Sequence, residues 1–84
     1  MASLTMYSTP WCGYCTRLKG QLDREGVELE VVDIDRDPAA AELVMTINGG
    51  NRTVPTVVYR DGSAHTNPPL KVVLGKLAEL QTAS

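Results

Sequence analysis

The apolar side chains of this sequence change their spacing near its two cysteines. Residues 4–8 alternate apolar and polar side chains, which is typical of a short strand. From Cys12 or Gly13 onward the apolar side chains recur three and four residues apart, which predicts a helix that ends at Gly26. The buried face of this helix is predicted to consist of Cys15, Leu18 and Leu22.

A second strand and a second helix follow in the next part of the chain. Residues 27–34 carry apolar side chains on both faces, which favours a strand inside a parallel pair that helices cover. Asp37-Pro38 places an acidic N-cap before a proline at the first helical position and predicts a helix start, and Gly49-Gly50 predicts its end. The buried stripe of that helix is predicted to consist of Ala40, Leu43, Val44 and Ile47.

The last third of the chain predicts a hairpin and a final helix. Residues 54–60 are predicted to form the third strand, Asp61-Gly62 a two-residue hairpin turn, and residues 63–66 the fourth strand. Asn67-Pro68 is predicted to open the last helix. The core face of that helix is predicted to consist of Leu70, Val73, Leu74 and Leu77.

The predicted elements give the order β-α-β-α-β-β-α in a single domain over residues 1–84. The first βαβ unit is expected to be a right-handed parallel crossover, and the last two strands an antiparallel hairpin. This order predicts an α/β fold of three layers, with a mixed four-stranded sheet and helices on both of its faces. Because nothing in the apolar pattern demands a dimer, we expect a monomer.

The charge balance excludes several classes of partner. Eight basic and ten acidic side chains give a net charge of −2, which argues against a nucleic-acid footprint. No apolar run approaches the ~18 residues that a membrane span needs. The first residues carry neither a basic segment nor an apolar stretch of the kind found in secretory signals, so we expect a cytoplasmic protein.

The cysteine and histidine counts narrow the chemistry further. The chain has two cysteines and one histidine, so one chain cannot supply a four-thiolate zinc site or a His-rich catalytic zinc site. A bridge between Cys12 and Cys15 would close too short a loop to add much stability. The two thiols are therefore expected to serve chemistry rather than structure alone.

The sequence C-x-x-C between a predicted strand and helix is typical of a redox site. The N–H groups and the positive dipole end of a helix N-terminus favour the anionic thiolate, so Cys12 is the candidate nucleophile. Cys15 lies one turn further on, where we expect less exposure, a high pKa, and reach to a disulfide formed at Cys12. Two alternatives stay open: two small buried apolar side chains, or half of a zinc or iron–sulfur site bridged between chains.

Three motifs in order resemble the glutaredoxin branch of the thioredoxin-fold superfamily: Thr9-Pro10-Trp11-Cys12-Gly13-Tyr14-Cys15, Thr53-Val54-Pro55 and Asp61-Gly62. The resemblance implies a thioredoxin-like fold and thiol–disulfide oxidoreductase activity. It also implies a cis bond between Val54 and Pro55, and a backbone at Val54 that pairs with the substrate's backbone or the thiol cofactor. From the residues alone, Pro55 indicates only an edge strand or a turn.

Two departures from the glutaredoxin pattern concern the small thiol. Gly13 stands where glutaredoxins commonly have proline, and residues 65–69 replace the Gly-Gly-Asp-type segment that binds the γ-glutamyl end of glutathione. Segments 48–56, 11–15 and 66–68 instead resemble the actinobacterial mycoredoxins, which use mycothiol, a sugar-linked cysteine thiol. This resemblance implies mycothiol, in preference to glutathione, as the reducing co-substrate, and no tightly bound cofactor.

Three side chains near the thiols have a functional interpretation and a structural one. Trp11 could offer an apolar surface to a partner or simply pack against the first helix. Tyr14 could wall the groove for the small thiol. Arg52 could stabilise the thiolate or meet a carboxylate, or be a solvated loop charge. The residues predicted to act are Cys12 and Cys15 in catalysis, and Trp11, Tyr14, Arg52, Thr53, Val54 and Pro55 in binding.

The leading hypothesis is an enzyme that reduces mixed disulfides between proteins and mycothiol through a Cys12 thiolate. Its expected partners are mycothiolated proteins, mycothiol and a disulfide reductase that uses NADPH. One alternative is a redoxin that thioredoxin reductase recycles and that donates electrons to ribonucleotide reductase. An alternative of another class is a module that binds zinc or an iron–sulfur cluster between two chains through Cys12.

Overall fold

The computed structural model describes residues 3–82, so the ends of the predicted 1–84 domain lie outside the described residues. The order of elements is the predicted β-α-β-α-β-β-α. Their bounds are β1 Leu4–Ser8, α1 Gly13–Arg24, β2 Leu29–Asp33, α2 Pro38–Ile47, β3 Thr56–Tyr59, β4 Ala64–Thr66 and α3 Leu70–Thr82. No helix among the described residues is long and apolar enough to cross a membrane.

The four strands form one mixed sheet in the order β2-β1-β3-β4. β1 runs parallel to β2, with Leu4 opposite Leu29, and antiparallel to β3, with Leu4 opposite Tyr59. β3 and β4 form the antiparallel hairpin that the sequence predicts. The mixed four-stranded sheet is therefore confirmed.

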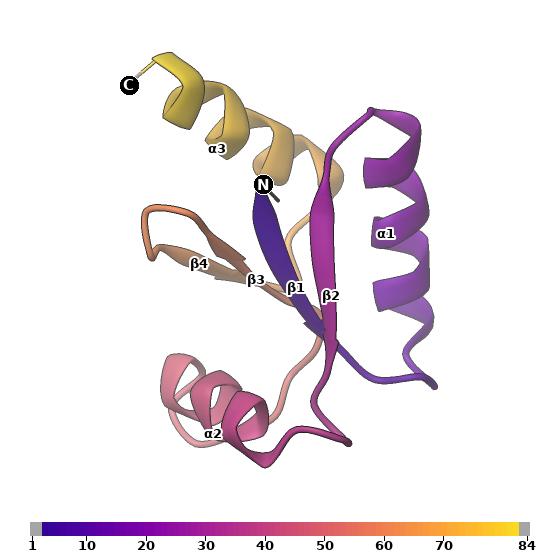
Figure 1. Ribbon diagram of the computed structural model, residues 1–84, viewed down its shortest axis with the longest axis vertical. Helices are drawn as coiled ribbons and strands as arrows, with labels where there is room; N and C mark the ends of the chain where they lie inside the picture. The colour runs from indigo at the N-terminus through magenta and orange to yellow at the C-terminus, as the bar shows by residue number, and fades with distance from the viewer. Residues whose placement is uncertain (1–2, 83–84) are drawn as a thin grey trace.

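The helices cover the two faces of the sheet, so the molecule has three layers (Figure 1). Alternate residues of β1 point to opposite faces: Met6 enters a core with α1 and α3, and Tyr7 packs toward α2. The first core contains Leu18, Leu22, Val57 and Val73, and the second contains Ile34, Ala40, Ala41 and Val44. This arrangement leaves the end of β1 and the start of α1 adjoining both cores.

Two predicted burial patterns are wrong. β2 lies at the edge of the sheet, and Val31 is 41% exposed, so the strand is not buried on both faces. Leu43, predicted on the buried stripe of α2, is also 41% exposed, whereas Val44 is fully buried. A short helix over an edge region covers only a narrow stripe, which explains why the wider apolar pattern over-predicted burial.

The boundaries of the hairpin and of α3 also differ from the prediction. The backbone N–H of Tyr59 donates to the Ser63 carbonyl at 2.9 Å, so the loop that connects these two residues has three residues and not two. Gly62 closes it at φ +88°, a conformation that glycine adopts without steric cost. Asn67 has φ +49° and is not helical, and α3 begins only at Leu70, after two prolines.

Candidate active site

Cys12 is the N-cap of α1 and follows the tight turn that connects the end of β1 to this helix. Its extended backbone, at φ −87° and ψ 106°, lets its sulfur turn back over the first helical turn. The Sγ of Cys12 accepts a hydrogen bond from the backbone N–H of Cys15 at 3.2 Å. No acidic side chain occupies the first turn of α1. Since this N–H has no partner inside the helix, the sulfur lies where a helix favours negative charge.

Cys15 sits one turn along α1 and is buried, with 4% of its surface exposed. Burial, and the side-chain hydrogen bond with Cys12, raise the pKa of the Cys15 thiol to about 12. Both cysteines are free thiols in this structure. Cys15 is therefore protonated at neutral pH, as the sequence predicted of the inner cysteine.

Burial is least expected at the break between a strand and a helix, where Cys12 stands, yet Cys12 is buried. Only 7% of Cys12 is exposed. The Val54-Pro55 segment lies over the sulfur, and the Sγ of Cys12 is 3.8 Å from the carbonyl oxygen of Val54. The Val54–Pro55 peptide bond is cis, as the resemblance implied. The burial of Cys12 thus comes from a segment forty residues away in sequence, not from its own turn.

Several hydrogen bonds hold the Val54-Pro55 segment in place. The Pro55 carbonyl accepts from the backbone N–H of Asn67 at 2.7 Å. The buried Thr56 hydroxyl donates to the Thr53 carbonyl at 2.8 Å and accepts from the Asn48 side-chain amide at 3.1 Å. The sequence analysis placed Asn48 and Thr56 in the segment 48–56 that resembles mycoredoxins, but it assigned no role to either side chain.

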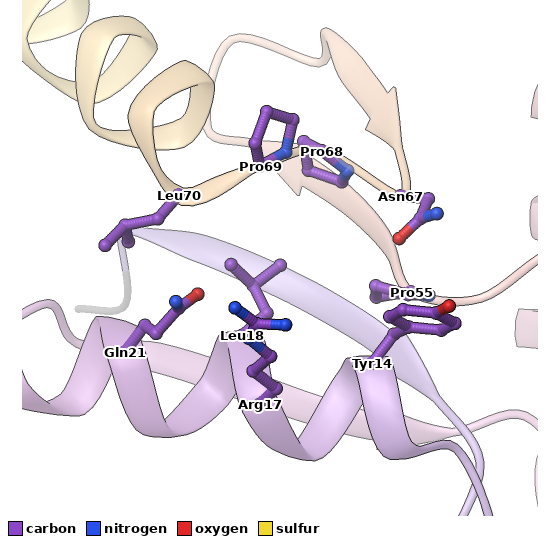
Figure 2. A pocket seen from close by; sticks show the side chains of 9 residues that line it. All are labelled: Tyr14, Arg17, Leu18, Gln21, Pro55, Asn67, Pro68, Pro69 and Leu70. Atoms are coloured by element: carbon purple, nitrogen blue, oxygen red, sulfur yellow. The ribbon is translucent and has the colours of Figure 1, made fainter.

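A groove of about 320 Å³ lies between α1 and the segment that leads into α3 (Figure 2). Figure 2 shows Tyr14 at the end of the groove nearest Pro55, with Arg17 and Gln21 further along α1. Asn67 lies opposite Tyr14 at this end of the groove, and Leu70 lies opposite Gln21 at the other end. The complete lining is Tyr14, Arg17, Leu18, Gln21, Pro55, Asn67, Pro68, Pro69 and Leu70. Arg17 is the charged side chain of this lining, so the groove carries no negative charge.

The other predicted binding residues lie outside the groove lining. Trp11 is 75% exposed, and its indole Nε1 donates to Asp35 Oδ2 at 3.2 Å, so it does not pack into the first helix. Arg52 and Thr53 are exposed in the loop before Val54. Over residues 3–82, no group of three or more His, Cys, Asp or Glu side chains is placed to hold a metal ion.

Comparison with known proteins shows the family to which this chain belongs. The family model described as glutaredoxin matches residues 4–63, which include both cysteines and the cis proline. The chain belongs to the glutaredoxin family. The fold and the activity that the resemblance implied are confirmed, and this glutaredoxin is a thiol–disulfide oxidoreductase.

The relatives of this glutaredoxin include actinobacterial proteins. A Mycobacterium tuberculosis protein assigned to the glutaredoxins is 52% identical over 79 residues, which cover 94% of each chain. Mycoredoxin 1 of Corynebacterium glutamicum is 45% identical over 80 residues, which cover 95% of this chain and 99% of that one. The crystal structure of a buckwheat glutaredoxin–glutathione complex matches with a TM-score of 0.72 at 28% identity, over 96% of this chain and 77% of that one.

Proposed function

We propose that this glutaredoxin reduces mixed disulfides between protein cysteines and mycothiol, with Cys12 as the nucleophile. The observation that carries the proposal is the hydrogen bond from the Cys15 N–H to the Cys12 sulfur at the start of α1. A helix N-terminus stabilises a thiolate, which is the form of cysteine that attacks a disulfide. Cys15 cannot take this role at neutral pH, because its pKa is about 12.

The proposed reaction has two exchange steps. In the first, the Cys12 thiolate attacks the mycothiol sulfur of the mixed disulfide, a Cys12–mycothiol disulfide forms, and the protein thiolate leaves and takes a proton from water. In the second, the thiolate of another mycothiol attacks the mycothiol sulfur of that adduct. Cys12 leaves as a thiolate and the two mycothiols are joined in a disulfide. Over both steps, the mixed disulfide and one free mycothiol become the protein thiol and mycothiol disulfide, so the free mycothiol is the reductant.

Cys15 offers a competing dithiol route. Once Cys12 carries a mixed disulfide, the Cys15 thiolate can attack the Cys12 sulfur, release the bound thiol and close a Cys12–Cys15 disulfide. The burial that raises the pKa of Cys15 leaves very little thiolate at neutral pH. This supports the route that uses a second mycothiol as the faster one under those conditions.

Two observations support mycothiol over glutathione as the small thiol. The chain is 45% identical to a protein named Mycoredoxin 1 over nearly all of both sequences. In place of a Gly-Gly-Asp-type segment, residues 65–69 run through Asn67 and two prolines along the edge of the groove. We propose that the sugar part of mycothiol lies along this groove, where Asn67 offers an amide group to hydroxyls at the end beside Tyr14 and Gln21 offers one at the other end.

The test is a recycling assay on the oxidised protein. Mycothiol, glutathione, and thioredoxin reductase with NADPH are each offered separately, and the products are identified by mass spectrometry. The proposal expects mycothiol to reduce the protein fastest and through a Cys12 adduct. Reduction by thioredoxin reductase alone would move the function to general dithiol electron transfer. A coloured or metal-containing protein would support the metal-binding alternative.

The proposed setting is the cytoplasm, where small thiols keep protein cysteines reduced. Free Cys12 and Cys15 fit such an environment. The proposed substrates there are proteins whose cysteines have become joined to mycothiol, and an NADPH-dependent disulfide reductase would regenerate the mycothiol.

A further inference from the structure

Asn48 joins three parts of the molecule that are distant in sequence. It follows the last turn of α2, where its backbone N–H donates to the Val44 carbonyl at 3.0 Å. Its half-buried side chain reaches β3 and β4 at once. The side-chain Nδ2 donates to the Thr56 hydroxyl at 3.1 Å, and the Oδ1 accepts from the hydroxyl of Thr66.

The contacts of Asn48 continue into the segment that covers the nucleophile. Its Nδ2 also approaches the Thr53 carbonyl at 3.5 Å, and Thr56 donates to that same carbonyl at 2.8 Å. Thr53 and Thr56 are the two ends of a turn whose centre is Val54-Pro55. The Val54 carbonyl, in turn, lies 3.8 Å from the Cys12 sulfur. A path of direct contacts therefore links the Asn48 amide to the backbone that faces the reacting thiol.

We infer that Asn48 is a positioning residue for the disulfide substrate, acting through the Val54 backbone. The inference rests on the proposed function, together with the pairing between substrate and the Val54 backbone that the resemblance to glutaredoxins implies. The Asn48 amide uses both of its functional ends, since the nitrogen donates toward Thr56 and the oxygen accepts from Thr66. Of the natural side chains of this shape, only asparagine combines a donor and an acceptor in this way.

The other contacts of the turn around Val54-Pro55 indicate why the Asn48 amide alone can affect its position. On the opposite side, the turn is held by the Asn67 N–H on the Pro55 carbonyl at 2.7 Å. Arg52, Thr53 and Asn51 before it are exposed, so the turn has little packing on its outer side. If the Asn48 bonds are lost, the Thr53 end can shift while the Pro55 end stays in place. Such a shift would rotate the Val54 carbonyl away from the substrate without unfolding either core.

The test compares variants that change different ends of the Asn48 amide. Asn48→Asp keeps the acceptor for Thr66 and removes the donor to Thr53 and Thr56, with almost no change in volume. Thr66→Val removes the donor to the Asn48 oxygen and leaves Asn48 itself unchanged, and it serves as the second variant if Asn48→Asp does not fold. Thr46→Ala is the matched control, because Thr46 is exposed on α2 and its hydroxyl donates only within that helix, to the Glu42 carbonyl.

Two rates are measured for each variant: kcat/KM for a protein mixed disulfide and the rate of Cys12 alkylation by iodoacetamide. Alkylation needs the thiolate but no substrate pairing with Val54. The inference expects Asn48→Asp to lower kcat/KM by about 3- to 10-fold, which corresponds to one lost hydrogen bond. Alkylation should be no slower than in wild type, because a shift of Val54 can only uncover the Cys12 sulfur. Thr66→Val is expected to lower kcat/KM by a smaller factor than Asn48→Asp does. Thr46→Ala is expected to leave both rates unchanged.

Two results would overturn the inference. One is an unchanged kcat/KM in a folded Asn48→Asp protein, or in Thr66→Val if the first variant does not fold. The other is an alkylation rate that falls in proportion to kcat/KM, which would mean that Asn48 acts on the sulfur or on the fold as a whole. The assay is run on a mycothiol mixed disulfide and on a glutathione mixed disulfide. The preference of the wild-type protein between these two substrates tests the proposed function, whereas the effect of Asn48→Asp tests the positioning role of Asn48.

Discussion

The backbone N–H of Cys15 donates to the Sγ of Cys12 at 3.2 Å, so the residue that carries the second thiol also stabilises the sulfur of the first. Burial, and then the side-chain hydrogen bond with Cys12, hold the pKa of the Cys15 thiol high, at about 12. One helix turn thereby gives two neighbouring cysteines different roles at neutral pH. The predictions below follow from this division and from the segments packed around it.

Replacing each cysteine by serine should have unequal effects. Cys12→Ser removes the sulfur at the helix start and should reduce turnover to the uncatalysed rate, because a hydroxyl at neutral pH is a poor nucleophile toward a disulfide. Cys15→Ser should keep most of the activity with mycothiol, since the Cys15 backbone N–H that supports Cys12 is retained. Steady-state rates with a mycothiolated protein check both. A Cys15→Ser protein without activity would make the dithiol route the real one.

The dithiol route should accelerate strongly with pH. Burial is the largest cause of the raised Cys15 pKa and does not depend on the Cys12 thiol, so the Cys15 pKa should stay above neutrality in a Cys12 mixed disulfide. The Cys15 thiolate fraction, and with it the rate of closing the Cys12–Cys15 disulfide, should therefore rise about 10-fold per pH unit above neutrality. The measurement is the release of a thiol from a preformed Cys12 mixed disulfide, followed by stopped flow at several pH values. A rate that levels off near neutral pH would contradict the raised pKa.

Tyr14 and Trp11 should affect different substrates. Tyr14 lines the groove beside Pro55, whereas Trp11 lies outside it and contacts Asp35. Tyr14→Ala should raise the KM for mycothiol by about 2- to 10-fold, the size of one aromatic contact, and change the reaction with protein substrate less. Trp11→Ala should show the opposite pattern. Measuring KM for both substrates in both variants checks this, and equal effects on both substrates would rule out separate sites.

Alkaline pH should destabilise the protein partly through Tyr59. Burial, and then the charge of Asp61, raise the pKa of Tyr59 from 10.0 to about 12. The folded protein therefore keeps this proton while the unfolded chain loses it, so stability falls as the pH rises from about 10 to about 12. Cys15 acts in the same direction from about pH 9.

The check on this prediction is urea denaturation of wild type and Tyr59→Phe. At neutral pH the variant should lose about 0.5–1.5 kcal/mol, because its ring cannot make the 2.9 Å hydrogen bond to His65 Nδ1. Above about pH 10 the variant should lose less stability with rising pH than wild type does. Parallel curves for the two proteins would show that Tyr59 makes no contribution to the alkaline loss.

The order of elements could be predicted because the starts of α1 and α2 carry a local signal, whereas α3 begins only after its predicted Asn67-Pro68 start. Asp37 caps α2 through its side chain on the Ala40 N–H, and Cys12 caps α1, as the sequence patterns indicated. The cis bond before Pro55 could be predicted only from the resemblance to glutaredoxins, because an isolated X-Pro sequence fits several turns.

The features that the sequence did not predict depend on contacts between distant segments. The burial of Cys12 comes from Val54, and the exposure of Val31 comes from the position of β2 at the edge of the sheet. The spacing of apolar residues along a sequence indicates which side chains share a face, but it does not indicate whether another segment covers that face. The sequence indicated Tyr14 as a wall of a groove for the small thiol, but not the opposite wall at residues 67–70, which lies more than forty residues further along the chain.

The most direct test of the central claim is to trap the first intermediate. Cys15→Ser protein is mixed with a mycothiolated protein, quenched with acid, and digested for mass spectrometry. The account predicts a disulfide between mycothiol and Cys12, together with free substrate thiol in equal amount. A disulfide between Cys12 and the substrate protein, or an adduct that forms equally well in Cys12→Ser, would contradict it.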